Sequence, residues 1–173
     1  MKRPNVSGYA AKIARKKQRM KIDLNFTTDY GQFYLNDKNF IGQTDSQFFW
    51  TDEAYENKIA VEKGILGICI GNDEGIVKCE IQILDSKSTT FDFTKSDHVV
   101  EASLTIQSGV LQVLDCPFSE IEFQEDIENG EYRVRVYSKN LESAYNENPN
   151  DSYLIEIWKE NFSEPIVLKK YLG

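Results

Sequence analysis

Short segments in which apolar and polar residues alternate recur along the chain, and this period of two constrains the fold more than any other feature. The alternation is cleanest at 132–137 and 154–158. Successive side chains of a strand point to opposite faces, so such segments predict strands with one buried and one solvated face. They predict a mainly β fold, an antiparallel β-sandwich of about nine strands. The later expected strands are 90–93, 98–107, 110–114, 120–124, 131–139, 153–159 and 166–171.

Two hairpins are expected to open this region, because Gly, Asn and Asp favour tight turns. The first joins strands at 22–26 and 33–35 through Asp-Tyr-Gly at 29–31, and the second joins 59–70 to 76–84 through Asn-Asp-Glu-Gly at 72–75. The second hairpin would place Cys69 and Cys79 nearly opposite each other. A disulfide between them therefore stays open at this point.

One short helix is expected at 51–58. Thr51 is a suitable N-cap, and Asp52 and Glu53 place negative charge in the first turn, where the helix dipole favours it. Trp50 precedes this helix at the end of a polar loop, and we expect it to pack under the sheet. The polar stretch at 141–152 is expected to be the widest loop.

Charge divides the chain into a basic N-terminal arm at 1–21 and a β-sandwich domain at 22–173. The arm holds eight Lys or Arg and no carboxylate, whereas the domain holds 12 basic and 28 acidic residues, a net charge of −16. Such a domain repels nucleic acid and membranes and attracts cationic partners. The arm, flexible or helical, could be a solvated tail, a nucleic-acid contact or a latch against the acidic domain.

The sequence contains no recognisable catalytic set. His98 is the only histidine, and its position inside an expected strand predicts a surface or strand-end residue rather than a catalytic base. The three cysteines, including Cys116, lack metal-ligand spacing and fit the reduced thiols of a cytoplasmic protein. No acidic run has EF-hand spacing, and no apolar run is long enough to span a membrane. We therefore expect no enzyme activity, no cofactor, no metal site and no membrane partner.

Acidic residues at the helix start and in the expected loops are candidates for contact with a basic protein, although solvated loop charge is the simpler interpretation. The candidates are Asp52, Glu53, Asp73, Glu74, Glu125, Asp126 and Glu128. An alternative function rests on the aromatic residues, because tyrosines, Trp50 or Trp158 could stack on sugars. The chain would then be a carbohydrate- or small-ligand-binding module.

Two blocks of sequence form a recognisable pattern. The first is Trp-Thr-Asp-Glu-Ala at 50–54, followed by Ala60, Gly64 and the strand into Gly71. The second is Gly-Glu-Tyr-Arg-Val-Arg-Val-Tyr at 130–137 with Tyr-Leu-Ile-Glu-Ile-Trp at 153–158. Together they resemble the competence protein J family, whose founding member inhibits a DNA-entry nuclease. The second block also looks like the C-terminal strands of other small bacterial β-sandwich proteins, some of them toxin immunity proteins. The basic arm lies outside the pattern.

The resemblance implies a protein that binds and silences a nuclease. The acidic domain suits that role, because a nuclease must present cationic groups to its phosphate substrate. The sequence therefore predicts a non-catalytic inhibitor or immunity protein that blocks a basic enzyme, a nuclease or toxin, in the cytoplasm. Nucleic acid would be contacted only through the arm.

Overall fold

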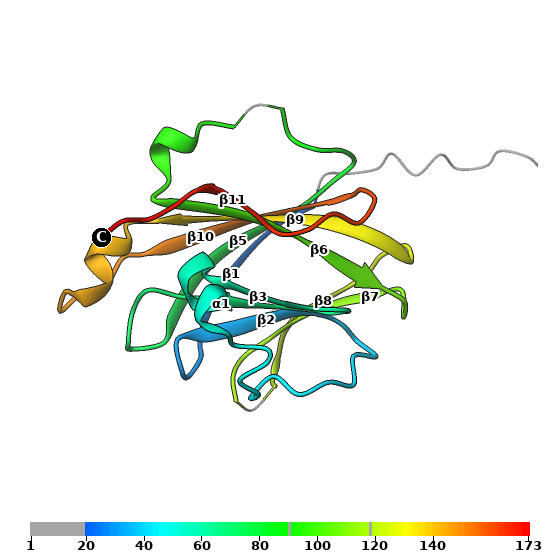
Figure 1. The fold of residues 1–173 in the computed structure, drawn as a ribbon, viewed down its shortest axis with the longest axis horizontal. Coiled ribbons are helices and arrows are strands. Elements are labelled where there is room, and N and C mark those ends of the chain that lie inside the picture. The colour runs from blue at the N-terminus through cyan, green and yellow to red at the C-terminus, as the bar shows by residue number, and fades with distance from the viewer. Residues whose placement is uncertain (1–19, 90, 118) are drawn as a thin grey trace, which may run out of the picture.

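The computed structural model describes residues 20–89, 91–117 and 119–173, which form two β-sheets packed face to face (Figure 1). The six-stranded sheet consists, in spatial order, of β1 (Met20–Thr27), β5 (Ile76–Leu84), β10 (Ser152–Lys159), β9 (Gly130–Lys139), β6 (His98–Ile106) and β11 (Ile166–Lys169). The five-stranded sheet consists of β3 (Ile59–Glu62), β4 (Ile65–Cys69), β2 (Gln32–Asp37), β7 (Val110–Leu114) and β8 (Ile121–Asp126). The predicted mainly β sandwich is confirmed, with two more strands than the expected nine.

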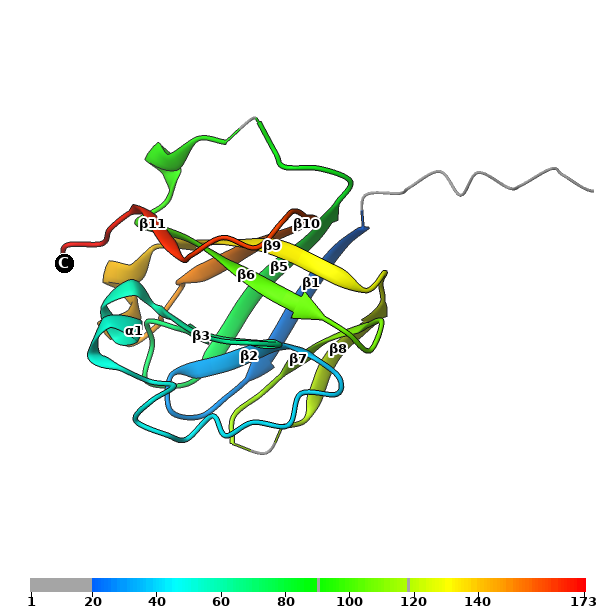
Figure 2. The same ribbon diagram turned by 45° about the vertical axis from the view of Figure 1, so that its right-hand side comes forward.

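The core lies between the two layers, which are seen apart in Figure 2. Leu104 and Ile155 of the six-stranded sheet and Phe33 of the other are completely buried there. Phe26 meets Phe33 edge to face, with ring centroids 5.6 Å apart, and so joins the two sheets. Alternating apolar residues thus supply the inner faces as the pattern predicts.

Both predicted hairpins are wrong, because each turn carries the chain from one sheet to the other. β1 pairs with β5, while the next strand, β2, pairs with β4 and β7. β4 and β5 likewise lie in different sheets. A tight turn between two alternating segments does not specify whether they pair edge to edge or stack face to face, since either arrangement buries their apolar sides.

This topology determines where the cysteines lie and whether they can pair. Cys69 faces Gln32 across one sheet and Cys79 faces Leu24 across the other, so the two thiols are not on paired strands. Both are free, as is Cys116. Burial raises the pKa of the Cys69 thiol to about 12 and raises that of Cys79 further. These cysteines therefore behave as small apolar side chains with little thiolate at neutral pH.

The helix is confirmed as α1 (Asp52–Asn57), with the Thr51 hydroxyl accepting the Ala54 backbone N–H at 3.1 Å. Among the described residues no helix is long and apolar enough to cross a membrane. The expected strand at 90–93 is wrong where it is described, since Phe93–Lys95 forms a 3-10 helix capped by Asp92. A second 3-10 helix, Leu141–Tyr145, occupies the expected wide loop.

The basic arm falls largely outside the described residues. Met20 and Lys21, at its end, already belong to β1. Lys21 forms an ion pair with Glu80 of the neighbouring β5, with its Nζ atom 2.6 Å from the carboxylate.

Each sheet also has a covered outer face. Residues 85–89 and 91–97 run over the six-stranded sheet and form the loop above β9 to β11 in Figure 1. On the other sheet, a second apolar cluster forms where Phe49, Trp50 and Ala54 pack against Tyr34 and Ile65. The expectation that each strand solvates one face is therefore wrong for β9, where Arg133, Arg135 and Tyr137 are buried as well as the alternating valines.

Candidate partner-binding site

The structure separates the seven predicted acidic residues into three groups. Asp52 and Glu53 begin α1, Asp73 and Glu74 form the exposed turn before β5, and Glu125, Asp126 and Glu128 lie at the end of β8 and before β9. Because β10 runs parallel to β5 and antiparallel to β9, the start of β5 and the start of β9 lie at opposite ends of the sandwich (Figure 1). The seven residues do not share one surface.

Three connecting segments meet at the end that carries Asp73 and Glu74. The Thr28 N–H donates to the Gly75 carbonyl at 2.8 Å, and the Asp29 N–H donates to the Cys116 carbonyl at 2.8 Å. We call residues 28–31, 72–75, 115–117 and 119–120 the acidic end. It carries exposed carboxylates at Asp29, Asp73, Glu74 and Glu120 and no Lys or Arg in its sequence. Asp29 and Glu120 were not among the sequence candidates, because only the tertiary structure brings their segments beside 72–75.

The turn with Asp73 and Glu74 is held rigidly. The Asn72 side chain donates to the Ile76 carbonyl at 2.8 Å and accepts the Ile76 N–H at 2.9 Å, so it brackets the turn from inside. Gly75 has a φ of +71°, and a Cβ atom there would lie 1.8 Å from the Thr28 carbonyl oxygen. A rigid turn loses little conformational entropy on binding, which favours its use as a contact.

Carboxylates repel one another beside this end. The pKa of Glu122 on β8 is raised, first by partial burial and then by the negative charges of Asp115 and Glu120. A raised pKa means that the local field disfavours further negative charge. A cationic group docking here would relieve that repulsion.

A pocket of about 670 Å³ opens between the acidic end and α1. Aromatic rings form much of its wall: Tyr30 comes from the acidic end, Tyr34 from β2, Trp50 from the loop before α1 and Tyr55 from α1 itself. Trp50 stacks on Tyr55 with ring centroids 5.2 Å apart and an interplanar angle of 26°. Among the described lining residues Asp45 is the only charged one.

The pocket is built on a glycine and on buried polar groups. Trp50 packs so closely on β4 that a Cβ at Gly67 would lie 2.5 Å from its ring. Deeper in the pocket, the Gln32 amide donates to the Tyr34 hydroxyl at 2.7 Å, which in turn donates to the Cys116 sulfur at 3.4 Å. Burial raises the pKa of Tyr34 to about 12, so this hydroxyl stays protonated.

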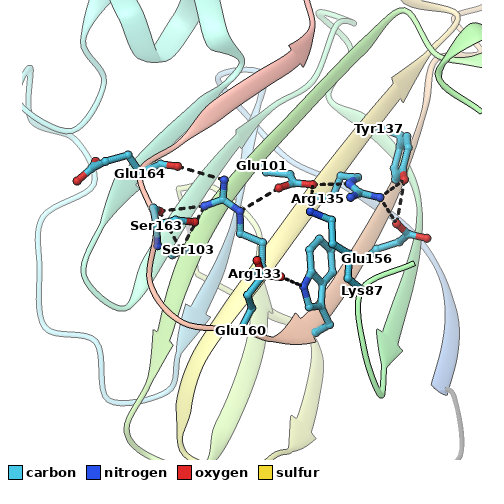
Figure 3. A network of polar contacts seen from close by, with 11 residues as sticks. Lys87, Glu101, Ser103, Arg133, Arg135, Tyr137, Glu156, Glu160, Ser163 and Glu164 are labelled. Carbon is cyan, nitrogen blue, oxygen red and sulfur yellow. Dashed lines mark hydrogen bonds and ion pairs between the residues drawn. The ribbon is translucent and has the colours of Figure 1, made fainter. Parts of the chain in front are cut away.

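A second polar site lies on the outer face of the six-stranded sheet (Figure 3). Glu101 on β6 bridges two arginines of β9: its carboxylate lies 2.6 Å from Arg135 Nε and 3.1 Å from Arg133 Nε. On the other side, Arg135 Nη1 lies 3.3 Å from Glu156 of β10, and the Tyr137 hydroxyl donates to the same carboxylate at 2.9 Å. Strand register places this row of alternating charges across three strands.

This network holds the two segments that cover it. Arg133 donates to the backbone carbonyls of Ser163 at 2.9 Å and Glu164 at 3.1 Å. The Arg135 guanidinium carbon lies 4.7 Å from the centre of the Phe91 ring and 5.1 Å from that of Trp158, within cation–π distance. These buried charges therefore fix the outer layer and do not form an exposed contact surface.

The electrostatics of Glu101 agree with a structural role. Burial alone would raise its pKa, but hydrogen bonds from Arg135 and Arg133 more than offset this and hold the pKa below its usual value of 4.5. Sequence reasoning treated these arginines as solvated. A partial signal was present, because Glu101 is the only charged residue of β6 and Glu156 lies between isoleucines in β10.

His98 is completely buried at the start of β6 and uses both ring nitrogens. Its Nδ1 accepts the backbone N–H of Tyr171 at 3.2 Å, so the neutral ring carries its hydrogen on Nε2, which donates to the Asn57 carbonyl at 2.9 Å. The ring links α1, β6 and the C-terminal segment. Its place at a strand end agrees with the sequence prediction, and its hydrogen bonds give it a structural role.

Lowering the pH should destabilise the protein through His98. Burial lowers the folded pKa below the ordinary value of 6.5, so the unfolded chain binds the proton first. The free energy of unfolding should therefore be fully present above about pH 6.5 and should fall as the pH drops towards the folded pKa. Urea denaturation across this range should show the loss, and His98→Gln, which cannot take up a proton, should show a smaller one. An equal pH dependence in both proteins would contradict this assignment.

The comparisons with known proteins rest on structure. No protein-family model matches the sequence, and a sequence search finds no match among curated proteins. Two solved structures share the fold. One is ComJ from Bacillus subtilis, described as an inhibitor of the DNA-degrading activity of NucA, with a TM-score of 0.62 and 17% identity over 83% of this chain and 99% of that chain.

The other is described as crocagin biosynthetic gene J, with a TM-score of 0.55 and 16% identity over the same shares of the two chains. The resemblance to competence protein J suggested by the sequence is thus confirmed at the level of the fold. The chain has the β-sandwich fold of ComJ over most of its length.

Proposed function

We propose that this protein is a non-catalytic inhibitor that binds a basic nuclease in the cytoplasm through its acidic end. The observation that carries the proposal is the acidic end itself, where exposed carboxylates from three chain segments lie together and those segments contain no basic residue. Catalytic sites for nucleic acids present cationic groups to phosphates. Carboxylates in a fixed array can occupy those groups and keep the substrate out.

Two further observations support this choice. ComJ, which shares the fold, inhibits a DNA-degrading enzyme, and this favours a nuclease over other basic enzymes. The chain's single histidine has both nitrogens engaged in internal hydrogen bonds, which leaves it unsuited to act as a catalytic base. Asp73 and Glu74 are the sequence candidates that belong to the acidic end, and Asp52 and Glu53 lie beyond the pocket on α1.

Inhibition of DNA degradation tests the proposal directly. Purified protein is mixed with NucA from Bacillus subtilis and, in parallel, with the basic-protein fraction of cells that produce it, and the loss of plasmid DNA is followed. We expect inhibition that saturates near one inhibitor per nuclease in at least one of the two. Serum albumin, also acidic, is the control for non-specific charge. Undiminished DNA degradation in both would overturn the proposal.

A further inference from the structure

The pocket between α1 and the acidic end has aromatic walls and a carboxylate, and no basic residue among the described residues lines it. Tyr30 and Tyr55 are 79% and 54% exposed, although large aromatic side chains are usually buried in cores. Exposed aromatic rings beside a concave site are typical of the central anchors of protein interfaces. A group that binds in this pocket should therefore interact favourably with both aromatic rings and a carboxylate.

The other side of the molecule shows which group such a wall accepts. There, Arg135 lies against the rings of Phe91, Trp158 and Tyr137 and pairs with Glu101, so a guanidinium sits among aromatic faces beside a carboxylate. The pocket offers the same elements, with Trp50 and Tyr55 stacked and Asp45 on the wall, but none of its described lining residues is cationic. A cation from outside the domain can complete it.

Trp50 provides an independent sign of an unfilled site. The residue is 8% exposed, yet its indole Nε1 has no hydrogen bond of normal geometry among the described residues, although it lies close enough to the Tyr34 hydroxyl to influence its pKa. A buried N–H without a proper partner costs free energy. Because Trp50 lines the pocket, this unsatisfied donor belongs to the wall that an incoming group would contact.

We infer that the pocket lined by Tyr30, Asp45, Trp50 and Tyr55 binds an arginine side chain of the protein partner, with the guanidinium against the rings and the Asp45 carboxylate. The identification of a basic nuclease as the protein that supplies this arginine rests on the proposed function. Charge complementarity carries it, because the acidic end and the first turn of α1 flank the pocket with further carboxylates.

A small arginine probe tests the pocket without any nuclease. The chain has two tryptophans, so its ¹H–¹⁵N spectrum has two indole signals, and the buried Trp158 on the other sheet is an internal control. Titration with N-acetyl-arginine methylamide should shift the Trp50 signal saturably and leave the Trp158 signal in place. The citrulline analogue, nearly isosteric but uncharged, should bind at least about fivefold more weakly, since the cation contribution is lost.

Matched variants locate the site. Asp45→Asn should weaken arginine binding about threefold to tenfold, because it removes one nearby charge, whereas Asp85→Asn, an equal change on the other sheet, should not. Both side chains are exposed, so neither change should alter the melting temperature. Equal binding of arginine and citrulline, or saturable binding of maltose instead, would overturn the inference in favour of a neutral-ligand pocket.

The basic arm of the same chain is the remaining competitor. Replacing Arg15, Lys16, Lys17 and Arg19 by glutamine should leave the Trp50 signal of the free protein unchanged. A shift of the Trp50 signal in this variant, relative to the unaltered protein, would show that the arm occupies the pocket. That result would overturn the assignment to an external partner.

The inhibition assay separates this inference from the proposed function. Asp45→Asn should weaken inhibition of the nuclease about tenfold, and Asp85→Asn should not. If the protein inhibits the nuclease equally well with Asp45→Asn, the pocket inference fails and the proposed function stands. If arginine binds the pocket but no basic nuclease is inhibited, the proposed function fails and the pocket keeps its cation specificity.

Discussion

Replacing Glu101 by alanine should lower the free energy of unfolding by about 3–5 kcal/mol, the largest effect that we expect from a single substitution. Glu101 is 4% exposed and neutralises Arg133 and Arg135, which are 2% and 1% exposed. Without it, two guanidinium groups stay buried with one carboxylate, Glu156, to balance them. The segments at 85–97 and 160–165 should also loosen, since the arginines hold both.

Chemical denaturation monitored by circular dichroism measures this loss. Glu56→Ala is the matched control, because Glu56 also forms an ion pair, with Lys170, but both of these side chains are largely exposed. This change should lower the free energy of unfolding by about 1 kcal/mol or less. Should Glu101→Ala not fold at all, Glu101→Gln keeps the size of the side chain and removes its charge. Equal losses for Glu101→Gln and the surface control would show that the buried network does not stabilise the fold.

The acid side of the stability profile gives a second readout of the same residue. Because the folded pKa of Glu101 is lowered, its stabilising effect is present above about pH 4.5 and is lost as the pH falls through the folded value. Glu101→Gln should therefore unfold with a weaker dependence on pH below about 4.5 than the unaltered protein. A parallel profile would mean that the arginines do not hold this carboxylate in its charged form.

Reversing both charges of the turn, with Asp73→Lys and Glu74→Lys together, should weaken the complex with the nuclease about 10-fold to 100-fold. The two substitutions change the local charge by four units at the surface that we propose as the contact, and like charges across an interface are strongly unfavourable. The effect should appear mainly in the association rate and should shrink as salt is added, because exposed charges act over about 10 Å at moderate ionic strength. Surface plasmon resonance over a series of salt concentrations measures both.

The opposite end of the sandwich supplies the control. Glu125→Lys with Asp126→Lys makes the same change in total charge, but these residues lie at the far end of the strands and should affect binding much less. If the two double variants bind equally weakly, net charge alone governs the encounter and the acidic end is not the contact. If the reversal at Asp73 and Glu74 has no effect, the contact lies elsewhere.

Local pattern was sufficient for most elements of this fold, although the strand expected at 90–93 is partly a 3-10 helix. The alternation in β6, β9 and β10 is set by the pleat of each strand, and Thr51 with Asp52 and Glu53 satisfies the start of α1 within a few residues. For the pairing of strands the same local information was insufficient. β1 and β2 follow each other through a tight turn yet lie in different sheets, since an alternating strand can bury its apolar face by either route.

The candidate site divides in the same way. The exposure of Asp73 and Glu74 could be predicted from sequence, because charged residues in a turn between strands are rarely part of a core. Asp29 and Glu120 joined them only through backbone hydrogen bonds between segments about 45 and 90 residues apart in the chain. The pocket could not be predicted from the sequence either. Its walls come from four segments, and its floor depends on Gly67 lying directly under Trp50.

By itself the sequence determined the β class, the helix start and the strongly acidic character of the domain, all of which depend on residue type or on neighbours along the chain. Only the tertiary structure decided which strands pair, which arginines are buried and which carboxylates share a surface. These depend on contacts between residues far apart in sequence. A period-two pattern fixes which side of a strand is apolar, but it does not specify what will cover the other side.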